Sequence, residues 1–156
     1  MSGSGKTSLL NVLTSGRHEG AEPPEGAVRF NGEQLTPEAS RKLMGYCEQS
    51  DTHVGVFTAR ELLTFSAALR MPAGTTDAMR ESRVATVLKQ LRLDQVADRP
   101  VGDDLVRGLS GGERRRVSIG LEMVVAPQVC AFHLIGNVDV DGWKAVSVAC
   151  FAGACA

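Results

Sequence analysis

The sequence predicts an α/β fold in which short strands and amphipathic helices alternate and pack in layers. Two observations support this class. The segments 27–30 and 43–48 have strand character, and longer segments with helical periodicity lie around them. No internal repeat or low-complexity stretch interrupts this order. With 156 residues, the chain has the length of one domain and can bury a core.

The first elements follow from local signals. Apolar side chains recur at helical spacing over 6–15, which predicts a helix there. Residues 27–30 alternate like a strand, and the following Asn31-Gly32 is a strong signal for a hairpin turn. Thr36-Pro37 predicts the start of a short helix that ends near residue 42.

Three longer helices are predicted after the second strand. Thr58 with Glu61 forms a capping box, which predicts a helix running to about residue 70. A second capping box, Ser110 with Glu113, starts a helix that ends before Pro127. Between them, the segment 77–91 is an amphipathic helix. Its expected buried face consists of the apolar residues Met79, Val84, Val87, Leu88 and Leu91.

Composition excludes several classes of function. The net charge is −1 and aromatic residues make up 4%, so we expect no nucleic-acid partner. The four cysteines form no C-x-x-C pair and have no zinc-ligand spacing with the three histidines. This usage predicts reduced thiols in a cytosolic setting. No apolar run reaches the length of a membrane-spanning helix.

The beginning of the chain has the character of a phosphate-binding loop. Residues 2–7, Ser-Gly-Ser-Gly-Lys-Thr, match the second half of the pattern G-x-x-x-x-G-K-[ST], whose first glycine would precede Met1. Backbone N–H groups of this loop face phosphates, Lys6 suits the β and γ phosphates, and the Thr7 hydroxyl suits magnesium. The alternative is a flexible Gly/Ser terminus before an ordinary helix.

A second helix start has the same chemistry. In Ser110-Gly111-Gly112-Glu113 the capping box marks the helix N-terminus, and the two glycines leave backbone N–H groups open to an anion. A plain capping box with a glycine turn is the alternative. Two anion-binding helix starts in one short chain indicate that the ligand is a nucleotide.

Together these two motifs resemble the nucleotide-binding domain of an ATP-binding cassette (ABC) transporter. The stretches 107–122 and 45–51 resemble its G subfamily, the white and pleiotropic-drug-resistance type. The resemblance covers residues 1–128. It implies a P-loop NTPase core with an antiparallel β subdomain and a helical subdomain that carries the Ser110 motif.

The resemblance also implies a set of site residues, with ATP and Mg²⁺ as cofactors. The implied ligands of magnesium are Thr7 and Gln49. The implied nucleotide-binding residues are Ser2, Gly3, Ser4, Gly5, Lys6, Thr7, Ser8, Gln49, Ser110, Gly111, Gly112 and Glu113.

In the family, the Ser110 motif binds the γ-phosphate of ATP held by a second nucleotide-binding domain, in a head-to-tail dimer. The other implied partner is the transmembrane domain of the same transporter, which places the chain at the cytosolic face of a membrane. The implied function is to couple ATP binding and hydrolysis to the export of lipid- or drug-like substrates.

The last segment, 129–156, departs from the family pattern, and we expect a divergent tail after a partial nucleotide-binding domain over 1–128. The family has a hydrophobic strand that ends in Asp-Glu, followed later by a switch histidine. Here the apolar run 129–135 is a candidate for that strand, but no acidic pair follows it. We therefore assign no catalytic residue and expect no hydrolysis from these residues alone.

Three other functions stay open at this point. The first is a catalytically inactive nucleotide-binding or dimerisation remnant without a role in transport. The second is another P-loop enzyme such as a kinase or GTPase, which the Ser110 motif disfavours. The third is an ABC ATPase of DNA repair or chromosome structure, which is disfavoured because no sustained heptads separate the two motifs.

Overall fold

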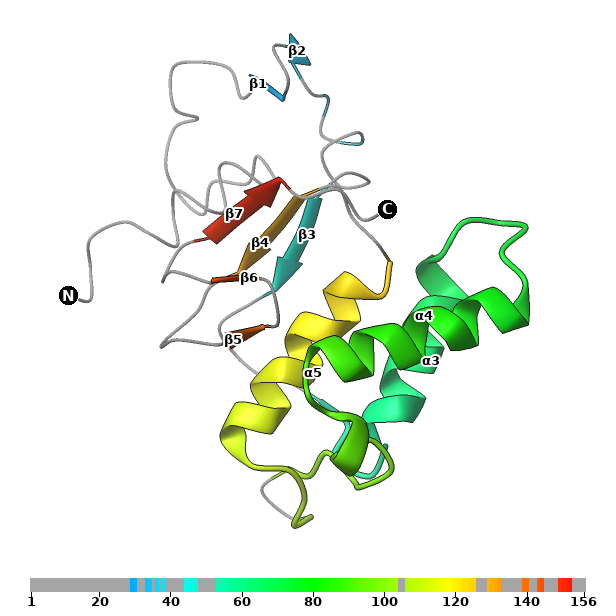
Figure 1. Cartoon of the computed structure of the whole chain (residues 1–156), viewed down its shortest axis with the longest axis vertical. Helices are drawn as coiled ribbons and strands as arrows, with labels where there is room; N and C mark the ends of the chain where they lie inside the picture. The colour runs from blue at the N-terminus through cyan, green and yellow to red at the C-terminus, as the bar shows by residue number, and fades with distance from the viewer. Residues whose placement is uncertain are drawn as a thin grey trace, which may run out of the picture.

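The structure of the chain is a computed structural model. It describes residues 29–30, 33–34, 36, 38, 44–47, 53–103, 106–125, 129–132, 139–140, 143–144 and 149–152. These residues form a small sheet and a unit of helices packed beside it (Figure 1). The predicted helix over 6–15 and most of the one over 36–42 lie outside the described residues.

The largest described sheet has three strands in the order β3–β4–β7. Strand β3 (Met44–Cys47) confirms the strand predicted over 43–48. It pairs in parallel with β4 (Val129–Phe132), with Met44 opposite Val129. Strand β7 (Ala149–Ala152) pairs antiparallel with the other edge of β4. The apolar run that starts at residue 129 therefore supplies the central strand of this sheet (Figure 1).

Two hairpins complete the described strands. Strands β1 (Arg29–Phe30) and β2 (Glu33–Gln34) pair antiparallel with Phe30 opposite Glu33. This register leaves two connecting residues, as the Asn31-Gly32 signal predicts. Strands β5 (Asp139–Val140) and β6 (Trp143–Lys144) form the second antiparallel pair.

The helical unit contains three α-helices, which confirm the three predicted ones. Helix α3 (Ala59–Arg70) starts at the predicted Thr58–Glu61 capping box. Helix α4 (Asp77–Gln90) is capped by the hydroxyl of Thr76, and the short 3₁₀ helix η1 (Asp94–Val96) follows it. Helix α5 (Gly111–Met123) starts at the predicted Ser110–Glu113 capping box. Local chemistry therefore decides where these helices begin.

Helix α5 lies at the centre of the described structure, because it packs on β3 and β4 as well as on α3 and α4. Its Gly120 allows a close approach: an added Cβ would lie 3.0 Å from Cδ1 of Leu91 and 3.4 Å from Cδ2 of Leu63. The core is continuous and reaches the sheet through Cys47 of β3. Its largest fully buried side chains are Leu63, Leu88, Leu91, Leu93, Ile119, Val87, Val101, Val117 and Val124.

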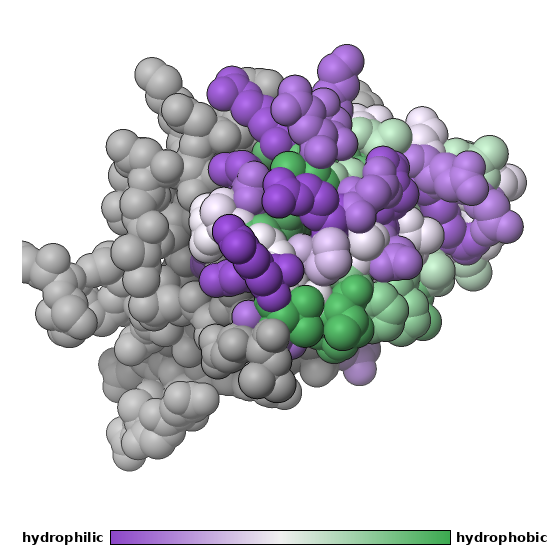
Figure 2. Space-filling view, turned by 90° about the horizontal axis from the view of Figure 1, so that it is seen from below, coloured by the Kyte–Doolittle hydropathy of each residue, from purple (hydrophilic) through white to green (hydrophobic). Residues whose placement is uncertain are grey.

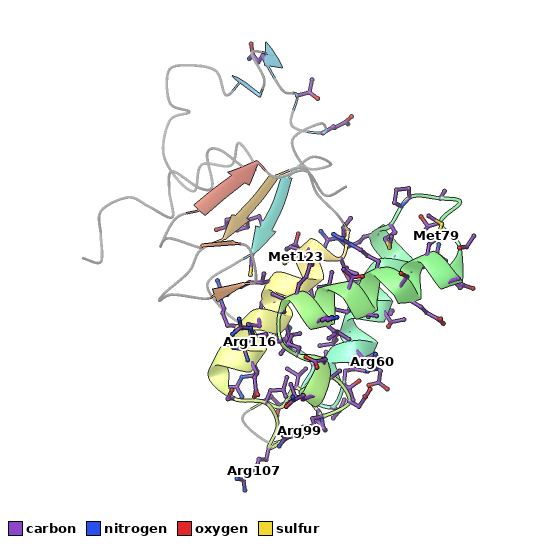
Figure 3. The ribbon with its side chains drawn as sticks, in the orientation of Figure 1. Arg60, Met79, Arg99, Arg107, Arg116 and Met123 are labelled. Atoms are coloured by element: carbon purple, nitrogen blue, oxygen red, sulfur yellow. The ribbon has the colours of Figure 1, made fainter. Side chains whose placement is uncertain are left out.

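One residue that was predicted to lie in the core is exposed. Met79 was expected on the buried face of α4, but its side chain is 59% exposed. Figure 3 shows Met79 in the first turn of α4, at the end of the helix farthest from α5. The helical period is correct, and Val84, Val87 and Leu88 are buried. The first turn of α4 lies far from α5, and no residue in the described part of the chain buries the Met79 side chain.

Arginines from two other helices hold the C-terminal end of α5. The Arg70 guanidinium forms two hydrogen bonds to the Glu122 carboxylate, at 2.8 and 2.9 Å, and donates to the Leu121 carbonyl oxygen at 3.3 Å. Nη2 of Arg83 donates to the Met123 carbonyl oxygen at 2.7 Å. Cations are favoured at this end because the last carbonyl groups of a helix carry partial negative charge.

Candidate functional site

The N-terminus of α5 is the part of the predicted site that the structure describes. Ser110 has extended backbone angles, φ −63° and ψ 159°, as an N-cap residue requires. Its Oγ accepts from the Glu113 backbone N–H at 3.3 Å. The Glu113 carboxylate accepts in return from the Ser110 backbone N–H and hydroxyl, both at 2.8 Å. Both halves of the capping box are therefore present.

The two glycines after this cap are open to solvent. Both are exposed, a Cβ added to Gly111 would meet no atom within 4 Å, and one added to Gly112 would approach only Nη1 of Arg116, at 4.0 Å. No packing constraint therefore demands glycine at either position. Within the described part of the chain, no acceptor bonds the backbone N–H of Gly111 or Gly112. Uncovered N–H groups at a helix N-terminus are the donors that anion-binding helix starts use.

The charges around this helix start are mixed. The hydrogen bonds from the backbone and side chain of Ser110 hold the pKa of Glu113 below its ordinary value, with smaller contributions from Arg116 and Arg99. Glu113 is therefore ionised at neutral pH. Arg99, Arg107 and Arg116 lie at the same end of the helical unit as the start of α5 (Figure 3). The guanidinium groups of Arg116 and Arg99 partly offset the Glu113 charge.

The loop that precedes the Ser110 cap is held by backbone hydrogen bonds. The Leu109 N–H donates to the Val101 carbonyl oxygen at 3.0 Å, and the Val101 N–H donates to the Phe57 carbonyl oxygen at 2.8 Å. The Gly102 N–H donates to the Gly55 carbonyl oxygen at 2.9 Å. Gly102 has φ +79°, which favours glycine, and its added Cβ would lie 2.6 Å from the Gly108 nitrogen. The loop before α5 is thus tied to residues 55–57.

A side-chain contact ties the same region to α5 itself. Nε2 of His53 lies 2.8 Å from Oγ of Ser118, in the middle of the helix. Ser118 is buried and His53 is half-buried. Sequence analysis missed His53, because a lone histidine before a capping box gives no signal that its partner lies 65 positions away.

The structure does not describe the other predicted site residues. Ser2 to Ser8 and Gln49 lie outside the described residues, so the structure brings together only Ser110, Gly111, Gly112 and Glu113. Among the residues that the structure describes, no group of three or more His, Cys, Asp or Glu side chains could hold a metal ion.

A further group of exposed residues is apolar. Phe65 and Leu69, one turn apart on α3, are 65% and 69% exposed. Val54, Val56 and Phe57, just before α3, are also exposed. We call these five residues the α3 apolar surface. Figure 2 shows apolar residues gathered at one side of this view of the molecule, beside hydrophilic ones. Exposed apolar side chains mark interaction sites where they form a contiguous patch.

Comparisons with known proteins agree with this architecture. The profile of the family described as ABC transporter matches residues 1–132. ABC transporter G family member 24 of Dictyostelium discoideum is 43% identical over 129 residues, which cover 83% of this chain and 11% of that protein. Human ATP-binding cassette sub-family G member 8 is 43% identical over 128 residues, covering 82% and 19%. The mouse broad substrate specificity ATP-binding cassette transporter ABCG2 is 41% identical over 127 residues, covering 81% and 19%.

The fold has a counterpart among solved structures. An ATP-binding subunit of an ABC transporter superposes with a TM-score of 0.58 at 22% identity, over 85% of this chain and 51% of that subunit. The chain therefore shares the fold of that subunit. The chain belongs to the ABC transporter family, and its relatives confirm the predicted resemblance to the G subfamily. It spans 11–19% of the length of the three relatives named above. None of the described helices has the length and apolar character needed to cross a membrane.

Proposed function

We propose that this chain is the ATP-binding part of an ABC transporter at the cytosolic face of a membrane. The transporter as a whole would couple ATP binding and hydrolysis to the export of lipid- or drug-like substrates, and this chain would contribute ATP binding. One observation carries the proposal: a complete capping box at Ser110 presents the open N–H groups of Gly111 and Gly112 to solvent. Those groups fit a terminal phosphate, because an anion can complete their hydrogen bonds without displacing any side chain.

Residues Ser2 to Ser8 would hold the phosphates of the ATP bound by this chain, and Lys6 would contact the β and γ phosphates. Thr7 and Gln49 would hold Mg²⁺, which neutralises phosphate charge when it is bound. The family match begins at residue 1 and includes all of these positions.

The second partner is another nucleotide-binding domain. Ser110, Gly111 and Gly112 are exposed, so their N–H groups are available to a phosphate that another molecule carries. A head-to-tail dimer would bring the Ser110 motif of each domain to the ATP of the other.

The transmembrane domain is the remaining partner, and we place its contact on the α3 apolar surface. Phe65 and Leu69 lie within two turns on one helix, and Val54 and Val56 follow Gln49 within seven positions. An apolar partner would therefore contact the helical unit close to the segment that carries Gln49.

The test of ATP binding is the variant Lys6→Ala. A charge-assisted hydrogen bond to phosphate contributes about 1.5–3 kcal/mol, so the Kd for MgATP should rise about tenfold or more in titration calorimetry. Lys89→Ala is the matched control, because Lys89 is an exposed lysine near the end of α4 and should leave the Kd unchanged. Equal affinity of parent and Lys6→Ala would refute the phosphate-loop assignment.

The test of the dimer is the variant Ser110→Arg. Because Ser110 would serve the partner's ATP, an isolated monomer should bind MgATP with nearly parental affinity. In the full-length transporter the same change should abolish ATP-dependent dimer closure, measured by cross-linking or by the distance between spin labels. Loss of ATP binding in the isolated monomer would place Ser110 in its own nucleotide site instead.

A further inference from the structure

One strand of the sheet comes from a segment beyond the part of the chain that matches the ABC transporter family. The match ends at residue 132, which is the last residue of β4. Strand β7 nevertheless pairs with β4 at four successive positions, from Val129 opposite Ala152 to Phe132 opposite Ala149. The edge of β4 that faces away from β3 is therefore paired by a segment that the family profile does not reach (Figure 1).

The two neighbours of β4 are held in different ways. Strand β3 packs on α5 and carries Cys47, which is buried in the core. Strand β4 also packs on α5. Among the described elements, β4 is the only one with which β7 makes extensive contact. Strand β7 is therefore attached to the described structure chiefly through its pairing with β4.

The sequence around β7 suits pairing with an open strand edge. Residues 145–156 contain no charged residue and no proline, and β7 itself reads Ala-Cys-Phe-Ala. A strand edge presents a row of backbone N–H and C=O groups, and uncharged segments without proline add to such a row readily. The edge of β4 thus selects for an extended, uncharged backbone.

The connection between the two strands is long enough for β7 to leave this edge. Sixteen residues separate Phe132 from Ala149 (149 minus 132 minus 1), and the β5–β6 hairpin lies among them. An extended chain of that length spans up to about 55 Å. Strand β7 can therefore detach and return while β4 stays paired with β3.

We propose that the edge of β4 opposite β3 is a strand-acceptor site, and that residues 149–152 of the same chain are its exchangeable ligand. The class of ligand is an extended, uncharged peptide that pairs antiparallel with residues 129–132. The inference goes beyond the proposed function, because it assumes nothing about nucleotide binding.

Occupation of the site in the same molecule is tested by an engineered disulfide. Position 131 lies directly opposite Cys150, and opposite Cα atoms in antiparallel strands are roughly 4.5–5.5 Å apart, within the range of a disulfide. In the full chain with Cys130→Ser and Cys155→Ser, Ala131→Cys should form a bridge between positions 131 and 150 on mild oxidation. Peptide mapping and a non-reducing gel should find it in the monomer. Adding Cys150→Ser is the matched control and should abolish it.

Exchange is tested with a labelled peptide of residues 145–156 that has serine in place of both cysteines, by fluorescence anisotropy. The tethered β7 competes at an effective concentration on the order of 1 mM, so the parent should bind the peptide weakly. Phe151→Pro with Ala152→Pro in the chain should bind it about tenfold or more tightly. One of two neighbouring residues in an antiparallel strand donates to its partner strand, and proline cannot donate.

The bridged chain supplies the opposite comparison. Oxidised Ala131→Cys should bind the peptide about tenfold or more weakly than the same chain after reduction, because the bridge keeps β7 on the edge. These two forms have one sequence, so they carry the test even if the proline variant does not fold. A peptide with proline at the positions of Phe151 and Ala152 is the matched probe and should bind neither form.

Four results would overturn the inference. Without a bridge between positions 131 and 150, β7 does not occupy the edge of β4. A bridge found only between two molecules would mean that the ligand is not the chain's own strand. Equal peptide affinity of the oxidised and reduced forms would place the peptide elsewhere, and no binding to the reduced form at millimolar peptide would show that β7 does not exchange. None of these results bears on MgATP binding, which Lys6→Ala tests separately.

Discussion

Two leucines on helix α3 should differ sharply when each is changed to alanine. Leu63 is fully buried and contacts α5 near Gly120, whereas Leu69 is 69% exposed on the same helix. Both changes remove the same atoms from one helix, and the gain in helix propensity from alanine is small beside the cost of a core cavity. The difference between them therefore isolates the cost of emptying the core.

The expected magnitude follows from burial. Leu63→Ala removes a fully buried side chain and leaves a cavity between α3, α4 and α5, which costs about 2–5 kcal/mol. Leu69→Ala removes a side chain that is already mostly in water and should change the free energy of unfolding by less than about 0.5 kcal/mol. With a urea dependence of about 2 kcal/mol per M, the midpoint should fall by about 1–2.5 M for Leu63→Ala and by less than about 0.3 M for Leu69→Ala.

The assay is urea unfolding of the purified chain, followed by circular dichroism of its helices. Slopes that are equal for parent and variants would show that only stability has changed. Equal midpoint shifts for the two variants would refute the packing of α3 on α5. A large shift for Leu69→Ala alone would mean that the α3 apolar surface is covered within the chain.

Two other predictions concern the cap and its supporting loop. Glu113→Gln keeps an acceptor for the Ser110 N–H but removes the charge whose folded-state pKa lies below the ordinary value of 4.5. The parent should therefore have a larger free energy of unfolding than Glu113→Gln, and this difference should be complete above about pH 4.5. It should shrink as the pH falls through the lowered pKa, in unfolding measurements from pH 7 to about pH 3. A constant difference across that range would contradict this. Gly102→Ala should cost more than about 1–2 kcal/mol, because φ is +79° and backbone atoms of Gly108 and Val106 block the new Cβ. Gly111→Ala meets open space and should be nearly neutral in thermal unfolding, and similar losses for both variants would show that the Gly102 site is not strained.

The parts of this fold that were predictable from the sequence are those decided by neighbouring residues. The capping boxes at Thr58 and Ser110 need only a hydroxyl and a glutamate three positions later, so both helix starts were correct. The hairpin between β1 and β2 likewise follows from two residues, Asn31 and Gly32.

Features that depend on distant partners were not predictable. Periodicity placed Met79 on the apolar side of α4 but could not show that its side chain is exposed. The bond between His53 and Ser118 has no local signature, because both residue types are common in exposed positions. Gly102 lay in a loop whose need for a positive φ appears only when the loop folds back on Gly108. The predicted phosphate-loop residues and Gln49 remain predictions.

The parallel pairing of β3 with β4 has a consequence for the order of folding. Met44 and Val129 lie opposite each other although 85 positions separate them (129 minus 44). Closing so long a loop in an unfolded chain costs about 4 kcal/mol of conformational entropy. Contacts among α3, α4 and α5 span shorter distances in the sequence, so we expect the helices to assemble first and bring the two strands together. A defect in the helical core, such as Leu63→Ala, would then slow formation of the sheet without altering any residue of a strand.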